Sequence, residues 1–288
     1  MTTAAKRMLA LSGLVISSLA AAAAVAADGG AATGMEATSL ARGPRTVDVI
    51  LADIARALGS DAAWKAHRNV RMKLEMTFQG MGISGTGERF ATKEDKALVV
   101  TDLPGMGTIR EGSNGKVTWA QDPINGTRRL AGAEAEQARL EDVWNAELRM
   151  NELYKTIELA PSSPPGQECL VLTPSEAPVV TNCYDAKTHL QVSQKGTRST
   201  PQGDMPFSST LKDWREVGGL KMPFSVDTQA GPITFTARMT DVKFDEPMDD
   251  KMFEPPGGGD AAGAKGEAGK GKGKGKPKAK PKPKTATP

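Results

Sequence analysis

Hydrophobic and polar residues alternate most clearly over residues 70–78. Every even position in this segment is apolar and every odd position is polar. Such a period of two is typical of a β-strand with one buried face and one solvent-facing side. We therefore predict a strand here whose inward side chains are Val70, Met72, Leu74, Met76 and Phe78.

The pattern before this strand has a helical period instead. Apolar residues recur three or four positions apart over 47–58, and Gly59 is placed to end the helix. A short second turn is predicted over 61–67. A further helix fits 133–152, and Trp144 is among its apolar residues.

Short strands fill the rest of the chain. They are predicted at 85–91, 96–103, 107–112, 116–121, 126–130, 155–160, 167–173, 179–185, 188–196, 206–216, 220–228 and 232–246. Asn114-Gly115 favours a tight hairpin between two of them. In the last strand Phe235 and Met239 share one phase and Val242 takes the other, which predicts a bulge. Many antiparallel strands with two helices predict a mainly antiparallel β fold, a meander that curls around the helices.

The N-terminus has the features of an export signal. Lys6 and Arg7 precede an apolar run that ends in small residues, so we predict a signal peptide over 1–27, cleaved near Ala27. The alternative is an uncleaved anchor over 8–27. No Cys follows the run to accept a lipid. We expect a soluble protein in the periplasm, with secretion as the second possibility.

The C-terminal segment 257–288 is rich in Gly, Lys and Pro, and its nine lysines outnumber Asp260 and Glu267. We predict a disordered tail, because this composition offers almost no apolar surface to bury. Before this tail we predict a flexible leader over 28–45 and a single folded domain over 46–256. The tail is either a solvated spacer or a weak tether to an anionic envelope surface, and we expect no nucleic-acid partner, because export separates the protein from nucleic acid. The lysines of the tether would be Lys270, Lys272, Lys274, Lys276, Lys278, Lys280, Lys282 and Lys284.

The two cysteines suit an oxidising compartment. Cys169 and Cys183 lie on consecutive predicted strands and are equidistant from residue 176, the centre of the intervening hairpin. We therefore predict a cross-strand disulfide. The alternative is a pair of free thiols, but their spacing is far from C-x-x-C.

Candidate chemistry is sparse. Residues 80–85 match G-x-G-x-x-G, but a strand follows where a dinucleotide site needs a helix, so a hairpin turn is the better interpretation. His67 and His189 are the two histidines of the chain and lie far apart in sequence. We predict no metal site, no cofactor and no enzyme activity.

The apolar residues are unusually rich in methionine, with 13 Met against two Tyr. Met suits both irregular cores and adaptable binding surfaces. The simple interpretation is an ordinary core. The alternative is an apolar concavity, left under the helices by a curved sheet, that receives a lipid.

Several segments resemble members of the outer-membrane lipoprotein-sorting carrier superfamily, the LolA/LolB-like proteins. The opening helix with Trp64 resembles their start, and residues 114–123 resemble a D-G-K-x-x-W-x-x-x-P hairpin. Residues 213–224 resemble a strand-turn-strand of the group, and 249–256 resemble its D-x-x-x-F-x-x-P-P ending, with one residue fewer between Phe253 and the prolines. The likeness covers about residues 46–256.

This resemblance implies a strongly curved, incomplete β-barrel wrapped around a helical lid, with acyl chains in the cavity and no cofactor. In the family an Arg before a Pro latches the lid, and residues 91–96 here contain neither. The leading hypothesis is a periplasmic protein that carries or senses a lipid-like or lipoprotein ligand. The alternatives are a non-carrier envelope interaction protein and, last, an exported hydrolase. The residues expected to line the pocket are Val70, Met72, Leu74, Met76, Phe78, Trp119, Trp144, Phe235 and Met239.

Overall fold

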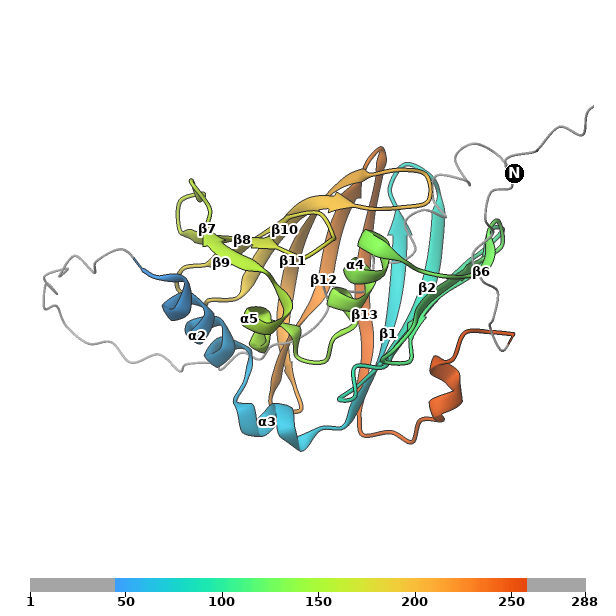
Figure 1. The fold of residues 1–288 in the computed structure, drawn as a ribbon, viewed down its shortest axis with the longest axis horizontal. Helices are drawn as coiled ribbons and strands as arrows, with labels where there is room; N and C mark the ends of the chain where they lie inside the picture. Colours follow the sequence, from blue (N-terminus) through green and yellow to red (C-terminus); the bar gives the residue numbers. More distant parts are fainter. Residues whose placement is uncertain (1–44, 258–288) are drawn as a thin grey trace, which may run out of the picture.

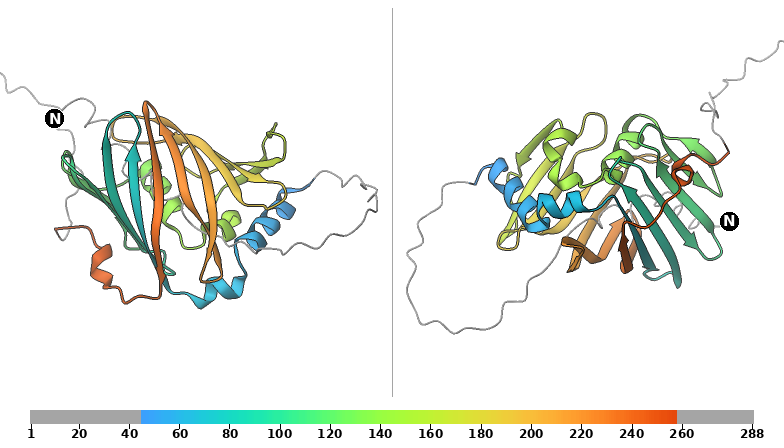
Figure 2. Two further views of the ribbon diagram at one scale, coloured as in Figure 1. Left: turned by 180° about the vertical axis from the view of Figure 1, so that it is seen from behind. Right: turned by 90° about the horizontal axis from the view of Figure 1, so that it is seen from below.

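The computed structural model describes residues 45–257. The predicted signal peptide, residues 28–44 of the leader and residues 258–288 of the tail lie outside this range. Within it, 13 antiparallel strands form one open sheet in the order β6-β5-β4-β3-β2-β1-β13-β12-β11-β10-β9-β8-β7. The sheet curls strongly into an incomplete barrel (Figures 1 and 2).

The sheet consists of two meanders joined in its middle. The first comprises β1 (Asn69–Phe78), β2 (Ile83–Thr92), β3 (Ala97–Leu103), β4 (Gly107–Ser113), β5 (Thr118–Asp122) and β6 (Gly126–Arg129). The second comprises β7 (Thr156–Leu159), β8 (Gln167–Thr173), β9 (Val180–Asp185), β10 (Gln191–Arg198), β11 (Met205–Val217), β12 (Leu220–Ala230) and β13 (Ile233–Phe244). Pairing of β1 with β13 makes them continuous. The segment between β6 and β7 therefore has to cross from one edge of the sheet to the other.

The helices gather on the concave side of the sheet (Figure 1). They are α2 (Val47–Leu58), α3 (Asp61–Ala66), α4 (Gly132–Asp142), the 3-10 turn η1 (Ala146–Leu148) and α5 (Met150–Leu153). The first helix begins where Thr46 accepts a hydrogen bond from Val49 N and ends at Gly59, whose φ is 131°. A Cβ there would lie 2.8 Å from the carbonyl oxygen of Gly219, so this close approach needs glycine.

The prediction of one helix over 133–152 is wrong, because the chain breaks after Asp142 into α4, η1 and α5. Asn145 adopts the left-handed conformation, with φ 50°. The break frees the amide of Trp144 to donate to Asp95 Oδ1 at 3.0 Å, and Arg149 pairs with the same carboxylate at 2.9 Å. Contacts with a turn some 50 residues earlier therefore replace the missing helical hydrogen bonds.

The register confirms the predicted bulge in the last strand. Lys73 pairs with Asp241 and Leu74 pairs with Met239, which leaves Thr240 without a partner residue on β1. The Thr240 hydroxyl donates to the carbonyl of Lys73 at 3.3 Å. The bulge explains the change of phase, because one extra residue turns the following side chains to the other face.

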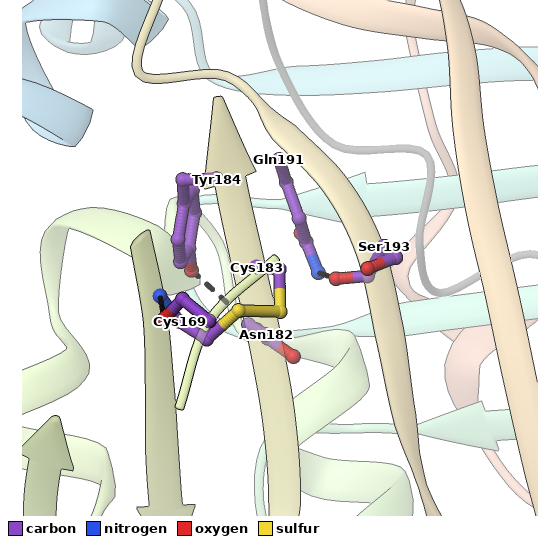
Figure 3. Close-up of a disulfide and its surroundings, with 7 residues drawn as sticks. Cys169, Asn182, Cys183, Tyr184, Gln191 and Ser193 are labelled. Atoms are coloured by element: carbon purple, nitrogen blue, oxygen red, sulfur yellow. Dashed lines mark hydrogen bonds between the residues drawn. A yellow bond between two sulfur atoms is a disulfide. The ribbon is translucent and has the colours of Figure 1, made fainter. Parts of the chain in front are cut away.

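The disulfide between Cys169 and Cys183 is present, as predicted, and joins directly paired residues of β8 and β9 (Figure 3). Both cysteines are buried. The amide of Cys169 donates to Ser163 Oγ at 3.1 Å, in the loop before β8. Side chains alternate across a strand, so Leu170 and Tyr184 point to the opposite, concave side.

A small second core lies on the convex face. It contains Leu98, Trp119 and Phe253, and Phe253 belongs to the 3-10 turn η2 (Asp250–Phe253), which lies outside the sheet (Figure 2). The indole of Trp119 donates to the Phe253 carbonyl at 2.8 Å. A Cβ on Gly112 would lie 2.6 Å from the indole ring, so the ring fits here only because residue 112 has no side chain. Trp119, expected among the pocket residues, therefore faces away from the concave side.

Candidate functional site

The candidate site is the concave face of the sheet together with the segment that covers it. We call residues 132–153, which comprise α4, η1 and α5, the lid. The lid crosses the concave face between the two edges of the sheet (Figures 1 and 2). Trp144 in the lid packs edge-on against Trp64 of α3, with the ring centroids 5.6 Å apart.

The expected pocket residues, apart from Trp119, come together under the lid. They belong to one buried cluster, in which their side chains pack against one another. Phe78 and Phe235, for example, have ring centroids 5.4 Å apart. The members of the cluster from the expected set are Val70, Met72, Leu74, Met76, Phe78, Trp144, Phe235 and Met239. Val70, Met72 and Trp144 also line a small cavity of about 20 Å³, which is room for one water molecule.

A larger cavity of about 80 Å³ lies between the lid and strands β8 to β11. Its apolar lining includes Leu140, Met150, Leu172, Val180 and Phe207, and its polar lining consists of Gln137, Glu141, Glu147, Tyr154, Asn182, Gln191 and Gln194. None of these residues was expected from the sequence. The predicted disulfide could have indicated those on β8 and β9, because pairing Cys169 with Cys183 fixes the register of the two strands and hence which of their side chains face inward.

Two buried arginines hold the C-terminal end of α4. Arg89 of β2 is 4% exposed; it lies 3.3 Å from Asp142 Oδ1 and donates to the Glu141 carbonyl at 3.0 Å. Arg198 of β10 is 6% exposed and pairs with Glu141 at 2.5 Å and with Glu111 of β4 at 3.3 Å. Cations are favourable at this end of a helix, where carbonyl groups lack partners. The lid is thus fixed to both halves of the sheet.

Burial perturbs the carboxyl groups of this network. Removal from water raises the pKa of Glu111 to about 7 and that of Asp142 to about 6, against the opposing effect of the nearby arginines. Burial alone would lower the pKa of Arg198, but the charges of Glu141 and Glu111 raise it. The network therefore contains carboxyl groups that change charge near neutral pH while the arginines stay charged.

Two further contacts fasten the N-terminal half of the lid. Arg128, at the end of β6, forms a bidentate pair with Glu134 at 2.6 Å. Glu136 accepts hydrogen bonds from the backbone amides of residues 175–177 in the β8–β9 loop. Burial opposes ionisation of Glu136, but these amides lower its pKa overall. The lid is therefore held by polar contacts at several points along its length.

Arg89 is an arginine anchor of the lid that the sequence did not indicate. Residues 91–96 contain no Arg, and Arg89 lies just before that segment, on the inward side of β2. Its partner Asp142 is 53 positions away in sequence. The pairing could not be inferred from local spacing, because it depends on where α4 ends.

Within residues 45–257 no group of three or more His, Cys, Asp or Glu side chains is arranged to hold a metal ion.

Among the described residues, no helix has both the length and the apolar character needed to cross a membrane.

Comparison with solved structures identifies the fold. A LolA superfamily protein from Nitrosomonas europaea superposes with a TM-score of 0.51 at 13% identity, over 73% of this chain and 98% of that one. A DUF1329 family protein from Desulfovibrio piger gives a TM-score of 0.50 at 12% identity, over 72% and 97%. The chain therefore has the LolA-like fold, a curved, incomplete antiparallel barrel. The sequence matches no family model and no curated protein.

Proposed function

We propose that this chain is a periplasmic binding protein that carries or senses a lipid-like ligand under its lid. The observation that carries the proposal is the lid itself, which covers an apolar concave face but is anchored by ion pairs and hydrogen bonds. A lid held by apolar packing alone would be a permanent part of the hydrophobic core. Polar anchors at Arg89 and Arg198 can instead be exchanged for water when the lid lifts.

The energetics of lipid transfer support such a lid. Keeping a 16-carbon acyl chain in water costs roughly 12 kcal/mol, at about 0.8 kcal/mol per methylene, so a carrier has to enclose the chain. The cavity of about 80 Å³ is smaller than the roughly 150 Å³ that accommodates benzene in an engineered core. The described state is therefore closed, and a whole acyl chain enters only when the lid moves away from the sheet.

In the open state the acyl chain lies against the apolar floor under the lid. That floor is formed by Val70, Met72, Leu74, Met76, Phe78, Phe235 and Met239, with Trp144 on the lid side. Trp119 has no part in it, because its ring is covered by η2 on the convex face.

The compartment is part of the proposal. The disulfide fits an exported protein, since such bonds persist in oxidising compartments. In this account residues 1–27 are a cleaved signal peptide, 28–45 a leader, 46–256 the binding domain and 257–288 a tail. The protein acts by binding, with no cofactor and no bond-making chemistry.

A dye titration tests the proposal. Delipidated protein is titrated with N-phenyl-1-naphthylamine, an uncharged dye that fluoresces in apolar surroundings. We expect saturable binding at one site per chain. Ala146→Leu places three more carbon atoms in the cavity and should weaken binding at least tenfold. Ala52→Leu, the same change on an exposed position of α2, should leave it unchanged. Absence of saturable binding to the unaltered protein would refute the proposal.

A second candidate function is favoured by the tight packing beneath the lid. A filled core suits a protein that uses this fold as an envelope interaction module without a ligand. Its partner would be an anionic surface contacted by the tail lysines between Lys270 and Lys284. Retention on anionic lipid vesicles that falls with salt and disappears on deletion of 257–288, in a chain that binds no dye, would select this function instead.

A further inference from the structure

The cavity under the lid has an acidic polar side. The residues lining it include Glu141 and Glu147 but no Lys, Arg or His. The carboxylate of Glu141 is already paired with Arg198 at 2.5 Å. Glu147, on η1, differs in that its Oε2 is shielded from solvent and makes no hydrogen bond to any described residue. Removal of this carboxyl from water raises the pKa of Glu147 to about 7.

A second buried polar group faces the same cavity. Asn182 of β9 is 8% exposed, and its Nδ2 donates to the Tyr184 hydroxyl at 3.5 Å. Its Oδ1 has no hydrogen-bond partner among the described residues. Figure 3 shows Asn182 beside the disulfide, on the strand next to Gln191, which also lines the cavity. Buried polar atoms are nearly always satisfied by protein, water or ligand, so the two unpartnered oxygens in this cavity are available to accept hydrogen bonds from a bound molecule.

We propose that the ligand presents an ammonium head group to this cavity, and that amphiphiles with carboxylate or phosphate heads are rejected. An ammonium group has three hydrogen-bond donors and no acceptor, which suits a cavity of oxygen acceptors. Its positive charge stabilises the ionised form of Glu147. An anionic head would instead meet two carboxyl groups with no basic residue in the lining. The apolar walls, among them Leu172, Val180 and Phe207, take the methylenes next to the head.

This inference rests on the proposed binding of an amphiphile under the lid and specifies its head group. It is tested with three probes of equal chain length: dodecylammonium, dodecanol and laurate. Each is titrated by calorimetry at pH 8 into the full-length delipidated protein, dodecylammonium and laurate below their micelle concentrations and dodecanol below its solubility limit. We expect dodecylammonium to bind at least tenfold more tightly than dodecanol, and laurate to bind most weakly of the three.

Two variants assign the preference to one side chain. Glu147→Gln keeps the shape of the side chain but removes its charge, and should cut the advantage of dodecylammonium over dodecanol at least tenfold. Glu152→Gln makes the same change on an exposed position of the lid, outside the cavity, and should leave the advantage intact. Thermal unfolding and dye binding establish that each variant is folded and that its site is open to ligand.

The possible results distinguish failure of the ammonium assignment from failure of the proposed function. If no probe binds and the dye does not bind either, the proposed function itself fails. If all three probes bind alike, or laurate binds best, the ligand site stands but the ammonium assignment is overturned. The assignment is also overturned if the preference survives Glu147→Gln.

Discussion

Replacing Arg89 by Met removes the buried cation that anchors the end of α4. The Met side chain occupies much of the same volume, so packing changes little. Asp142, however, is left buried without the guanidinium that lies 3.3 Å from its carboxylate. Removing one partner of a buried ion pair costs about 3–5 kcal/mol, which is a large part of the roughly 5–15 kcal/mol that stabilises a domain.

The cost should depend on pH in a defined direction. Burial raises the pKa of Asp142 in the folded protein to about 6, and Arg89 opposes this rise. Without Arg89 the pKa rises further. The folded variant then holds a proton that the unfolded chain has released, so its stability falls as the pH rises. The loss relative to the unaltered protein should be largest at pH 8 and smaller at pH 5, where Asp142 is protonated in the folded variant.

Urea unfolding followed by tryptophan fluorescence at pH 5 and pH 8 measures this effect. Arg56→Met is the control, because that side chain is 73% exposed and its pairing with Asp53 is worth less than about 1 kcal/mol. The double variant Arg89→Met, Asp142→Leu should recover much of the loss, since it removes both charges of this ion pair and leaves neither partner buried alone. The role assigned to Arg89 is refuted if Arg89→Met is as stable as the unaltered protein at pH 8, or if it loses the same free energy at both pH values.

Three further changes test other parts of the structure. Replacing Cys169 and Cys183 together by Ala should lower the free energy of unfolding by about 3 kcal/mol, measured in urea; an unchanged midpoint would contradict this. Gly112→Ala places a Cβ within 2.6 Å of the Trp119 indole, so it should lower the free energy of unfolding by about 1–3 kcal/mol. It should also shift the tryptophan emission to the red, and an unshifted spectrum would count against the close contact. The pKa of Glu111 is raised by burial to about 7, so its contribution should lower the free energy of unfolding by on the order of 3 kcal/mol between pH 5 and 8, in addition to the contributions of Asp142 and Glu147; Glu111→Gln should reduce the slope, and an equal slope in the variant would exclude Glu111 as a cause.

Features that depend on neighbouring residues could be predicted from the sequence. Strand β1 shows a complete alternation because one face is buried along its whole length. The disulfide followed from counting positions outward from a hairpin, which depends only on local register. The bulge at Thr240 followed from a change of phase within one strand.

Features that depend on distant residues could not be predicted. The lid breaks after Asp142 because Asp95, in a turn between two other strands, binds the amide of Trp144. Trp119 faces outward because Phe253 of η2, 134 positions later, covers it on the convex face, and β5 has too few residues for alternation to distinguish its two sides. The inward position of Arg89 is hidden in a strand whose other inward positions include glycines. The cavity itself depends on how the lid is placed, which no local pattern encodes.

The central claim is that an amphiphile occupies the space between the lid and the sheet. Native mass spectrometry of the protein isolated gently from its own cell envelope tests this claim most directly. We expect one amphiphile bound per chain, retained in Ala52→Leu and lost in Ala146→Leu. The claim is contradicted if the unaltered protein shows only its own mass and the delipidated protein binds none of the three dodecyl probes.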